Sequence, residues 1–328
     1  MHMKRAHTTR TAAATAVTAL GALLLTSCGA GNAAVPETQA AGGKRKFDDS
    51  PQQHRVRGHK DAKLAAQVPA KIRKRGTLAV GSSTDGSPPL NFYASDDRTP
   101  IGVETDIATL VADNLGLKAR IEPSSWENLF VGLDSGKLDA GFSNITVTEE
   151  RKQKYDFATY REDQVSFETR KGGGLGRVRG PADLAGKRVA VSSGTNQEKI
   201  LTDWSARNRK AGRKPIDIRY FQRSSDYYLA LQSGRIDAYL GPNPNVAYHV
   251  ATSGQTRSVG TLSGGGGSVQ GKIAATTKKD NGLVKALHGA LNKAIEDGSY
   301  AKVLKRWDLS TESVPRSEIN PPGLPAAS

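Results

Sequence analysis

The chain has 328 residues, which exceeds one ordinary domain and predicts one large or two modest domains. Hydrophobic residues make up 37% and charged residues 24%, a balance that fits a globular protein and argues against a disordered chain. The formal net charge of +15 would suit a nucleic-acid-binding protein, so the placement of the basic residues along the chain has to be considered.

Residues 1–27 have the pattern of a secretory signal, with a basic start and a mostly Ala/Leu/Val run from Thr11 to Leu25. That run is too short to form a stable transmembrane helix. It is followed by Leu25-Thr26-Ser27-Cys28-Gly29, which resembles the lipobox of bacterial lipoproteins, where the cysteine is acylated and the peptide is cut before it. We expect the single cysteine, Cys28, to carry lipid and to anchor the chain at the outer face of the cell membrane; a buried or free thiol is the alternative.

Residues 28–70 predict a flexible tether, because they are rich in Gly, Ala, Gln, Lys and Arg and lack the apolar spacing needed to bury one face. Lys4, Arg5 and Arg10 leave with the signal, so +15 minus 3 gives +12 on the mature chain. A further basic block lies in the tether: Lys44, Arg45, Lys46, Arg55, Arg57 and Lys60. We interpret this block as solvated charge beside an anionic membrane surface and expect no nucleic-acid partner.

From residue 71 onward, strand-like and helix-like segments alternate, which predicts an α/β fold. The strand Thr77–Val80 runs into a turn-rich loop over residues 81–86. The spacing of Ile107, Leu110, Val111 and Leu115 predicts an amphipathic helix with Thr105 or Asp106 as its N-cap. Residues 126–133 predict a second helix, and residues 140–142 a short strand.

Two phrases recur about a hundred residues apart. Leu133–Ala140 is echoed by Leu231–Ala238, each a helix end, a glycine and a strand start, and Gly76–Val80 is echoed by Gly186–Val191. The repetition predicts two similar α/β lobes. Near the C-terminus, two apolar stripes at helical spacing predict core helices, Leu283 to Ile295 and Tyr300 to Trp307. The Pro-rich residues 313–328 predict an extended or loose tail.

Residues 72–312 resemble the extracellular solute-binding proteins of family 3, the polar amino-acid receptors of ABC importers. The motifs that carry the resemblance are Gly76–Gly81, Gly102–Ile107, Trp126–Leu129, Ser135–Ala140, Thr146–Arg151, Tyr155–Ala158 and Asp183–Lys187. The resemblance implies the type II periplasmic-binding-protein-like fold, in which two lobes joined by two crossovers close over a ligand. We place the crossovers near residues 168–174 and 264–271, so that lobe 1 comprises residues 71–168 and 271–312 and lobe 2 comprises residues 169–270.

The resemblance also implies a ligand site. Arg151 matches the family arginine that clamps the carboxylate of an amino acid. Trp126 matches an aromatic that stacks on the ligand, and Ser143, Asn144 and Thr146 match short polar contacts. Without the resemblance, Arg151 would be interpreted as a surface charge and Trp126 as a core side chain.

On lobe 2, Thr195 and Asn196 stand between a strand and a helix start, where free N–H groups can face an anion. An ordinary N-cap is the alternative, and it is compatible with binding. The family usually places an acidic residue after the second Asp-Ala strand to pair with the ligand ammonium, but Pro242 or Asn243 stands there. Either the ammonium is held elsewhere, for example by Asp85 in the first loop, or the ligand lacks one.

No cofactor or metal is predicted, because the sequence has no Cys/His metal spacing, no G-x-S-x-G elbow and no G-x-G-x-x-G loop. The expected partners are a small polar ligand, most simply an amino acid, and ABC permease subunits, with the chain itself a monomer. A dehydratase-like enzyme on the same fold is one alternative, which would need a poised acid such as Asp85. A ligand-sensing lipoprotein is the other.

Overall fold

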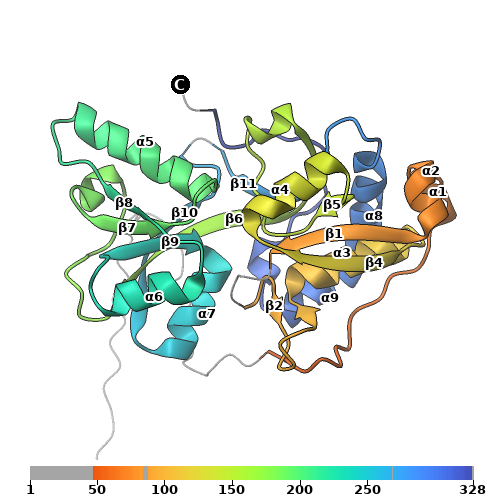
Figure 1. Ribbon diagram of the computed structural model, residues 1–328, viewed down its shortest axis with the longest axis horizontal. Coiled ribbons are helices and arrows are strands. Elements are labelled where there is room, and N and C mark those ends of the chain that lie inside the picture. Colours follow the sequence, from red (N-terminus) through yellow and green to blue (C-terminus); the bar gives the residue numbers. More distant parts are fainter. Residues whose placement is uncertain (1–46, 84–87, 268, 327–328) are drawn as a thin grey trace, which may run out of the picture. The chain divides into compact units, whose positions relative to one another are not determined.

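The computed structural model describes residues 47–83, 88–267 and 269–326 (Figure 1). The predicted signal segment, Cys28 and Asp85 lie outside the described residues. Within those ranges, no helix has the length and apolar character needed to cross a membrane.

Residues 47–75 are packed against the following domain, which differs from the flexible tether expected through residue 70. The Arg55 Nε donates to Asp106 Oδ1 at 2.8 Å, and Arg57 forms an ion pair with Asp113. Two short helices follow, α1 (Ala62–Gln67) and α2 (Ala70–Arg75), and the Asp61 side chain caps the first of them. Arg55 and Arg57 looked solvated in the sequence because their carboxylate partners lie about fifty positions further along the chain.

The sheet of lobe 1 has the strand order β4-β1-β5-β11-β6. Its strands are β1 (Thr77–Ser83), β4 (Lys118–Ser124), β5 (Ala140–Gly141), β6 (Tyr155–Arg170) and β11 (Gly271–Lys278), with a small separate pair β2 (Phe92–Tyr93) and β3 (Pro100–Ile101). β1 is parallel to β4 and β5, whereas β11 is antiparallel to β5 and β6. The helices are α3 (Val103–Asn114), α4 (Trp126–Ser135), α8 (Val284–Glu296) and α9 (Ser299–Arg306). The predicted core helices of the C-terminal part are thus present, and their apolar stripes are buried.

One helix start differs from the expectation. α3 begins at Val103 with Gly102 at its N-cap, whereas the sequence suggested Thr105 or Asp106. Both of these side chains are buried inside the helix. Asp106 is held there by Trp307 Nε1, which donates to its Oδ2 at 2.9 Å, so its carboxylate serves tertiary packing and not the helix end.

The same sheet continues into lobe 2 in the order β6-β9-β7-β8, and β10 pairs with β6 on a separate branch. The new strands are β7 (Arg188–Val191), β8 (Asp217–Tyr220), β9 (Ala238–Pro242) and β10 (Thr256–Ser263). The helices of lobe 2 are α5 (Asn196–Lys210), α6 (Ser224–Gln232) and α7 (Asn243–Ser253), with the short 3-10 turn η2 (Pro181–Leu184). Two further 3-10 turns, η1 (Arg151–Gln153) and η3 (Ser310–Glu312), belong to lobe 1. Figure 1 shows β6 running from one lobe into the other.

The first crossover lies earlier than predicted. β6 pairs with β11 up to Asp163 and with β10 from Gln164 onward, so the chain passes between lobes inside a continuous strand and not near residues 168–174. β6 crosses between the lobes without a break and therefore needs no glycine at the crossover. The glycines at 172–174, which suggested the later position, come after the end of this strand. The second crossover, residues 264–270, lies between β10 and β11, within the predicted range.

The tail over residues 313–326 is packed and extended. Leu324 forms an isolated bridge with Thr148, and Ile319 forms one with Ala158. Leu324 is also part of the apolar core of lobe 2. Of the two predictions for the tail, extended or loose, the structure therefore agrees with the extended one.

Candidate ligand-binding site

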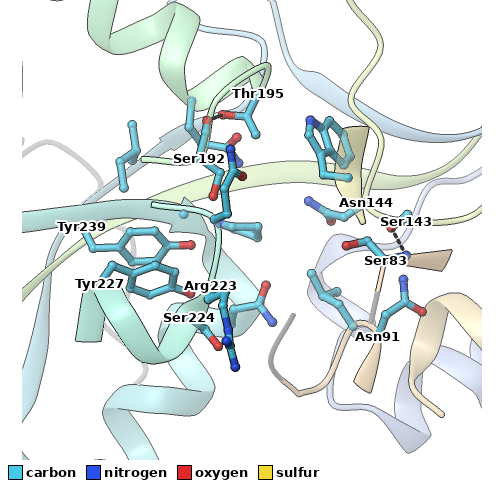
Figure 2. A pocket seen from close by; sticks show the side chains of 18 of the residues that line it. Ser83, Asn91, Ser143, Asn144, Ser192, Thr195, Arg223, Ser224, Tyr227 and Tyr239 are labelled. Carbon is cyan, nitrogen blue, oxygen red and sulfur yellow. Dashed lines mark hydrogen bonds between the residues drawn. The ribbon is translucent and has the colours of Figure 1, made fainter. Parts of the chain in front are cut away.

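A cavity of about 190 Å³ lies between the lobes and takes its walls from both of them (Figure 2). The lobe 1 wall includes Ser83, Leu90, Asn91, Ser125, Trp126, Glu127, Ser143 and Asn144. The lobe 2 wall includes Ser192, Thr195, Asn196, Gln197, Gln222, Arg223, Ser224, Tyr227, Tyr239, Leu240, Gly241, Pro242 and Asn245. The volume is below the roughly 300–1,000 Å³ of pockets for drug-sized ligands, so it suits a small solute.

The fold explains why these polar residues meet. Ser83 ends β1, Ser143 follows β5, and Ser192 follows β7, three strands with parallel neighbours. Carboxyl ends of parallel strands lie at the same sheet edge, which is where open α/β sheets bind ligands. Ser143 Oγ in turn accepts a hydrogen bond from the Ser83 N–H at 2.8 Å, which joins two of the strand ends (Figure 2).

Asn144 is held in place from behind the cavity. Its backbone has a φ of 52°, its N–H donates to Glu104 Oε2 at 3.2 Å, and its side-chain oxygen accepts from Arg161 Nη2. Arg161 is 1% exposed and also pairs with Glu104 and with Glu312 of η3. Burial lowers the pKa of Arg161, but the two carboxylates outweigh it and raise that pKa above the ordinary value, so the guanidinium stays charged.

Arg151 is next to Trp126 but does not line this cavity. Its Nη1 donates to the Thr146 carbonyl at 2.8 Å and its Nη2 donates to the Gly194 carbonyl of lobe 2 at 3.0 Å, while the guanidinium carbon lies 5.2 Å from the Trp126 ring centroid. It faces a second, larger cavity of about 1180 Å³, which Thr195 and Asn196 also line. Burial lowers the pKa of Arg151 to about 10, which leaves it charged at neutral pH.

Two other expected site residues are also away from the cavity wall. Thr146 is fully buried, and its hydroxyl donates to Asp163 Oδ2 at 2.7 Å. The side-chain oxygen of Asn243 accepts from the Ser166 hydroxyl at 2.7 Å. Pro242, beside it, does line the cavity, so the position where the acidic residue was expected is on the wall.

Of the predicted residues, five therefore line one cavity: Trp126, Ser143, Asn144, Thr195 and Asn196. Thr195 also caps α5, because its hydroxyl accepts from the Glu198 N–H at 3.2 Å, so this residue is an N-cap that also lines the cavity.

The aromatic residues on the lobe 2 wall of the cavity were not predicted from the sequence. Tyr227 and Tyr239 stack with ring centroids 3.9 Å apart and an angle of 11° between planes, on the lobe 2 wall (Figure 2). Burial raises the pKa of both phenols well above 10, so they present neutral hydroxyls. Tyr239 directly follows the repeated Asp-Ala phrase and could have been found from it, whereas Asn91 and Arg223 lie in no recognisable motif.

Comparison with known sequences agrees with this architecture. The family described as bacterial extracellular solute-binding proteins, family 3, matches residues 78–310. The chain belongs to this family. The L-cystine-binding protein TcyJ of Escherichia coli (strain K12) is 31% identical over 238 residues, which cover 72% of this chain and 84% of TcyJ.

Two solved structures give the same result for the fold. An ancestral arginine-binding protein bound to arginine superposes with a TM-score of 0.62 at 28% identity, covering 71% of this chain and 98% of that protein. An ancestral amino-acid-binding protein described as a precursor of cyclohexadienyl dehydratase superposes with a TM-score of 0.60 at 26% identity, covering 72% and 97%. The relatives are binding proteins of the two-lobed type.

In this solute-binding protein, direct polar contacts join the lobes around the cavity. Besides the contact of Arg151 with Gly194, Lys199 Nζ donates to Glu150 Oε2 at 2.8 Å and Asn245 Nδ2 donates to the Pro88 carbonyl at 3.1 Å. These contacts connect segments that a change in lobe angle would separate.

His249 and His288, the histidines that follow the predicted signal and tether, do not line the cavity. His249 Nδ1 is 2.5 Å from the buried Glu168 carboxylate, and His288 is bonded to Asn292 on α8. Among the residues that the structure describes, no group of three His, Cys, Asp or Glu side chains could hold a metal ion.

Proposed function

We propose that this chain is the substrate-binding component of an ABC importer and that it captures a free amino acid between its lobes. The observation that carries the proposal is the small cavity whose walls of hydroxyl, amide and aromatic groups come from both lobes. Such a ligand would be enclosed only when the lobes are together, so occupancy and lobe closure would be linked. Relatives named for cystine and arginine binding support an amino acid as the ligand class.

The carboxylate of the ligand would be bound by Arg151. In this structure Arg151 lies outside the wall of the small cavity, so its guanidinium would have to leave the Gly194 carbonyl and turn toward the ligand. Its two donors now contact main-chain carbonyls, and a carboxylate is a stronger partner because the hydrogen bond becomes charge-assisted and can be bidentate. We propose that the ligand replaces the Gly194 carbonyl as acceptor, while Trp126 packs against the carbon atoms of the ligand. Ser143, Asn144 and Thr195 would supply the remaining polar contacts.

The proposed location of the protein in the cell rests on the sequence. We propose that Cys28 carries lipid, that the chain is held at the outer face of the cell membrane, and that it works as a monomer which delivers its ligand to permease subunits. The basic tether supports this arrangement, because positive charge beside a lipid anchor adds affinity for an anionic membrane surface.

Binding without turnover is part of the proposal. Of the described residues, Glu127 is the one carboxylate that lines the cavity, and it is exposed. Asp85, the acid that the dehydratase-like alternative would need, lies outside the described residues, so recovery of the ligand unchanged is the test that separates binding from turnover.

The test is a thermal-shift screen of the purified full chain against the common amino acids and L-cystine, followed by calorimetry on those that raise the melting temperature. A ligand that binds the folded state alone stabilises it. We expect one amino acid or a chemically related group to bind at equilibrium and to be recovered unchanged. Absence of any shift, or recovery of an altered compound, would contradict the proposal.

A further inference from the structure

The Asp163 carboxylate is placed where both lobes reach it. Asp163 is the last residue of β6 that pairs with β11, and the next residue pairs with β10. Its Oδ2 accepts from the Thr146 hydroxyl of lobe 1 at 2.7 Å and from Asn196 Nδ2 of lobe 2 at 3.0 Å. One oxygen atom therefore connects the two lobes at the crossover.

The surroundings allow this carboxylate little freedom. Asp163 is 1% exposed, and its backbone carbonyl accepts from the Gly264 N–H of the second crossover at 2.9 Å. A Cβ added at Gly264 would overlap the Asp163 carboxyl group, so the glycine is needed for this close approach. Both crossovers thus meet at one buried acid.

Asn196 is the partner that reaches the ligand cavity. It is 4% exposed, lines the cavity, and donates through Nδ2 to both Asp163 Oδ2 and the Gly264 carbonyl, the latter at 2.9 Å. A primary amide has two donor hydrogens and one acceptor oxygen. With both hydrogens directed at the crossovers, the amide oxygen is the part of the side chain left for a ligand.

We propose that Asp163 is a positioning residue: it holds the lobe angle at the crossover and orients Asn196 so that the amide oxygen accepts a hydrogen bond from the ligand's ammonium group. This rests on the proposed amino-acid ligand. It also explains how the site can have Pro242 where an acidic residue was expected. The neutral amide oxygen of Asn196, held in place by Asp163, would accept the hydrogen bond of the ammonium instead.

The experiment is a double-mutant cycle on the full chain with Asp163→Ala, Asn196→Ala and the double variant, using L-arginine, L-glutamine and L-cystine as probes in calorimetry. Each single substitution is expected to weaken binding about tenfold, the effect of one or two buried hydrogen bonds. The double variant is expected to be no weaker than the worse single variant, because both remove the same contact. Asp297→Ala, at an exposed aspartate that follows α8 and lines neither cavity, is the matched control and should bind like the wild type.

A second readout does not depend on a ligand. In a Cys28→Ser background, dyes at Lys137→Cys on lobe 1 and Arg209→Cys on lobe 2 report the distance between lobes by energy transfer. Asp163→Ala is expected to broaden the distance distribution, and Asp163→Asn, which keeps the shape of the side chain, to restore most of the wild-type distribution.

The outcomes separate this inference from the proposed function. If the wild type binds none of the probes, the proposed function fails, and with it the part of the inference that concerns the ammonium; the distance distributions then decide the part that concerns lobe angle. Wild-type affinity in Asp163→Ala, or additive losses in the double variant, would overturn the inference while leaving the proposed function intact. If Asp163→Ala does not fold, the cycle is made with Asp163→Leu, which fills a similar space but has no acceptor oxygen, and additive losses there overturn the inference equally.

Discussion

The Asp237 carboxylate of lobe 2 accepts hydrogen bonds from both the backbone N–H and the guanidinium of Arg188, at 2.8 Å and 2.7 Å. Its counterpart in the repeat, Asp139 of lobe 1, accepts from the Ala79 N–H at 2.7 Å and pairs with Arg75. In each lobe this aspartate ties the strand that follows the helix to the first strand of the lobe. The aspartate of the repeated sequence therefore makes the same kind of hydrogen bond to a strand backbone in both lobes.

This pairing predicts a pH dependence of stability. Burial opposes ionisation of Asp237, but the Arg188 hydrogen bonds outweigh it and lower the pKa below the ordinary 3.8. The ionised carboxylate therefore stabilises the fold above about pH 4, and this contribution is lost as the pH falls through the folded-state pKa. Asp237→Asn is expected to cost about 1 kcal/mol at neutral pH, since the pair is partly exposed, and much less near pH 3. Urea unfolding at both pH values measures this; an equal cost at both would contradict it.

Arg151→Ala is expected to weaken binding of a carboxylate ligand by roughly 10- to 100-fold, the loss of a charge-assisted pair of hydrogen bonds. The matched control is Arg213→Ala, an exposed arginine in the turn after α5, which should bind like the wild type. Calorimetry with an amino acid that binds the wild type is the measurement. Undiminished affinity in Arg151→Ala would remove Arg151 from the site.

Gly241→Ala is expected to damage the aromatic wall. A Cβ at this position would overlap the Tyr239 phenol, which has no room to retreat because it stacks on Tyr227. Overpacking of this kind costs about 1–3 kcal/mol of stability, and the displaced ring should weaken binding as well. Gly176→Ala, where nothing lies near the added Cβ, is the control. Thermal unfolding and calorimetry on both variants decide it; unchanged behaviour of Gly241→Ala would show that the ring can move freely.

Cys28→Ser is expected to release the protein from the membrane fraction into the medium of the producing cells, because the tether then carries charge but no acyl chain. Fractionation and immunoblotting measure the distribution, and Thr26→Ser, which keeps the cysteine, is the control. A Cys28→Ser protein that stays with the membrane would contradict lipid attachment at this residue.

Local patterns were enough to predict much of the fold. The spacing of apolar residues predicted α3, α8 and α9, and the repeated phrases predicted the matching strands of the two lobes. These features depend on neighbours within one or two helical turns or one strand, which the linear sequence contains. The N-cap of α3 was wrong because Asp106 is used by Trp307, about two hundred residues away.

The sequence by itself determined that the chain is a two-lobed α/β protein, because repeat, periodicity and turn chemistry act over short stretches, whereas the candidate site residues came from the resemblance to the family. Only the tertiary structure decided which polar residues share a cavity: it placed Asn144 on the wall of the small cavity and Arg151 on that of the larger one, and it brought Asn196 to Asp163 across the lobes. It also packed the basic segment after residue 46 against lobe 1. Such contacts depend on how whole elements pack, and no local spacing specifies which distant side chain a buried carboxylate will meet.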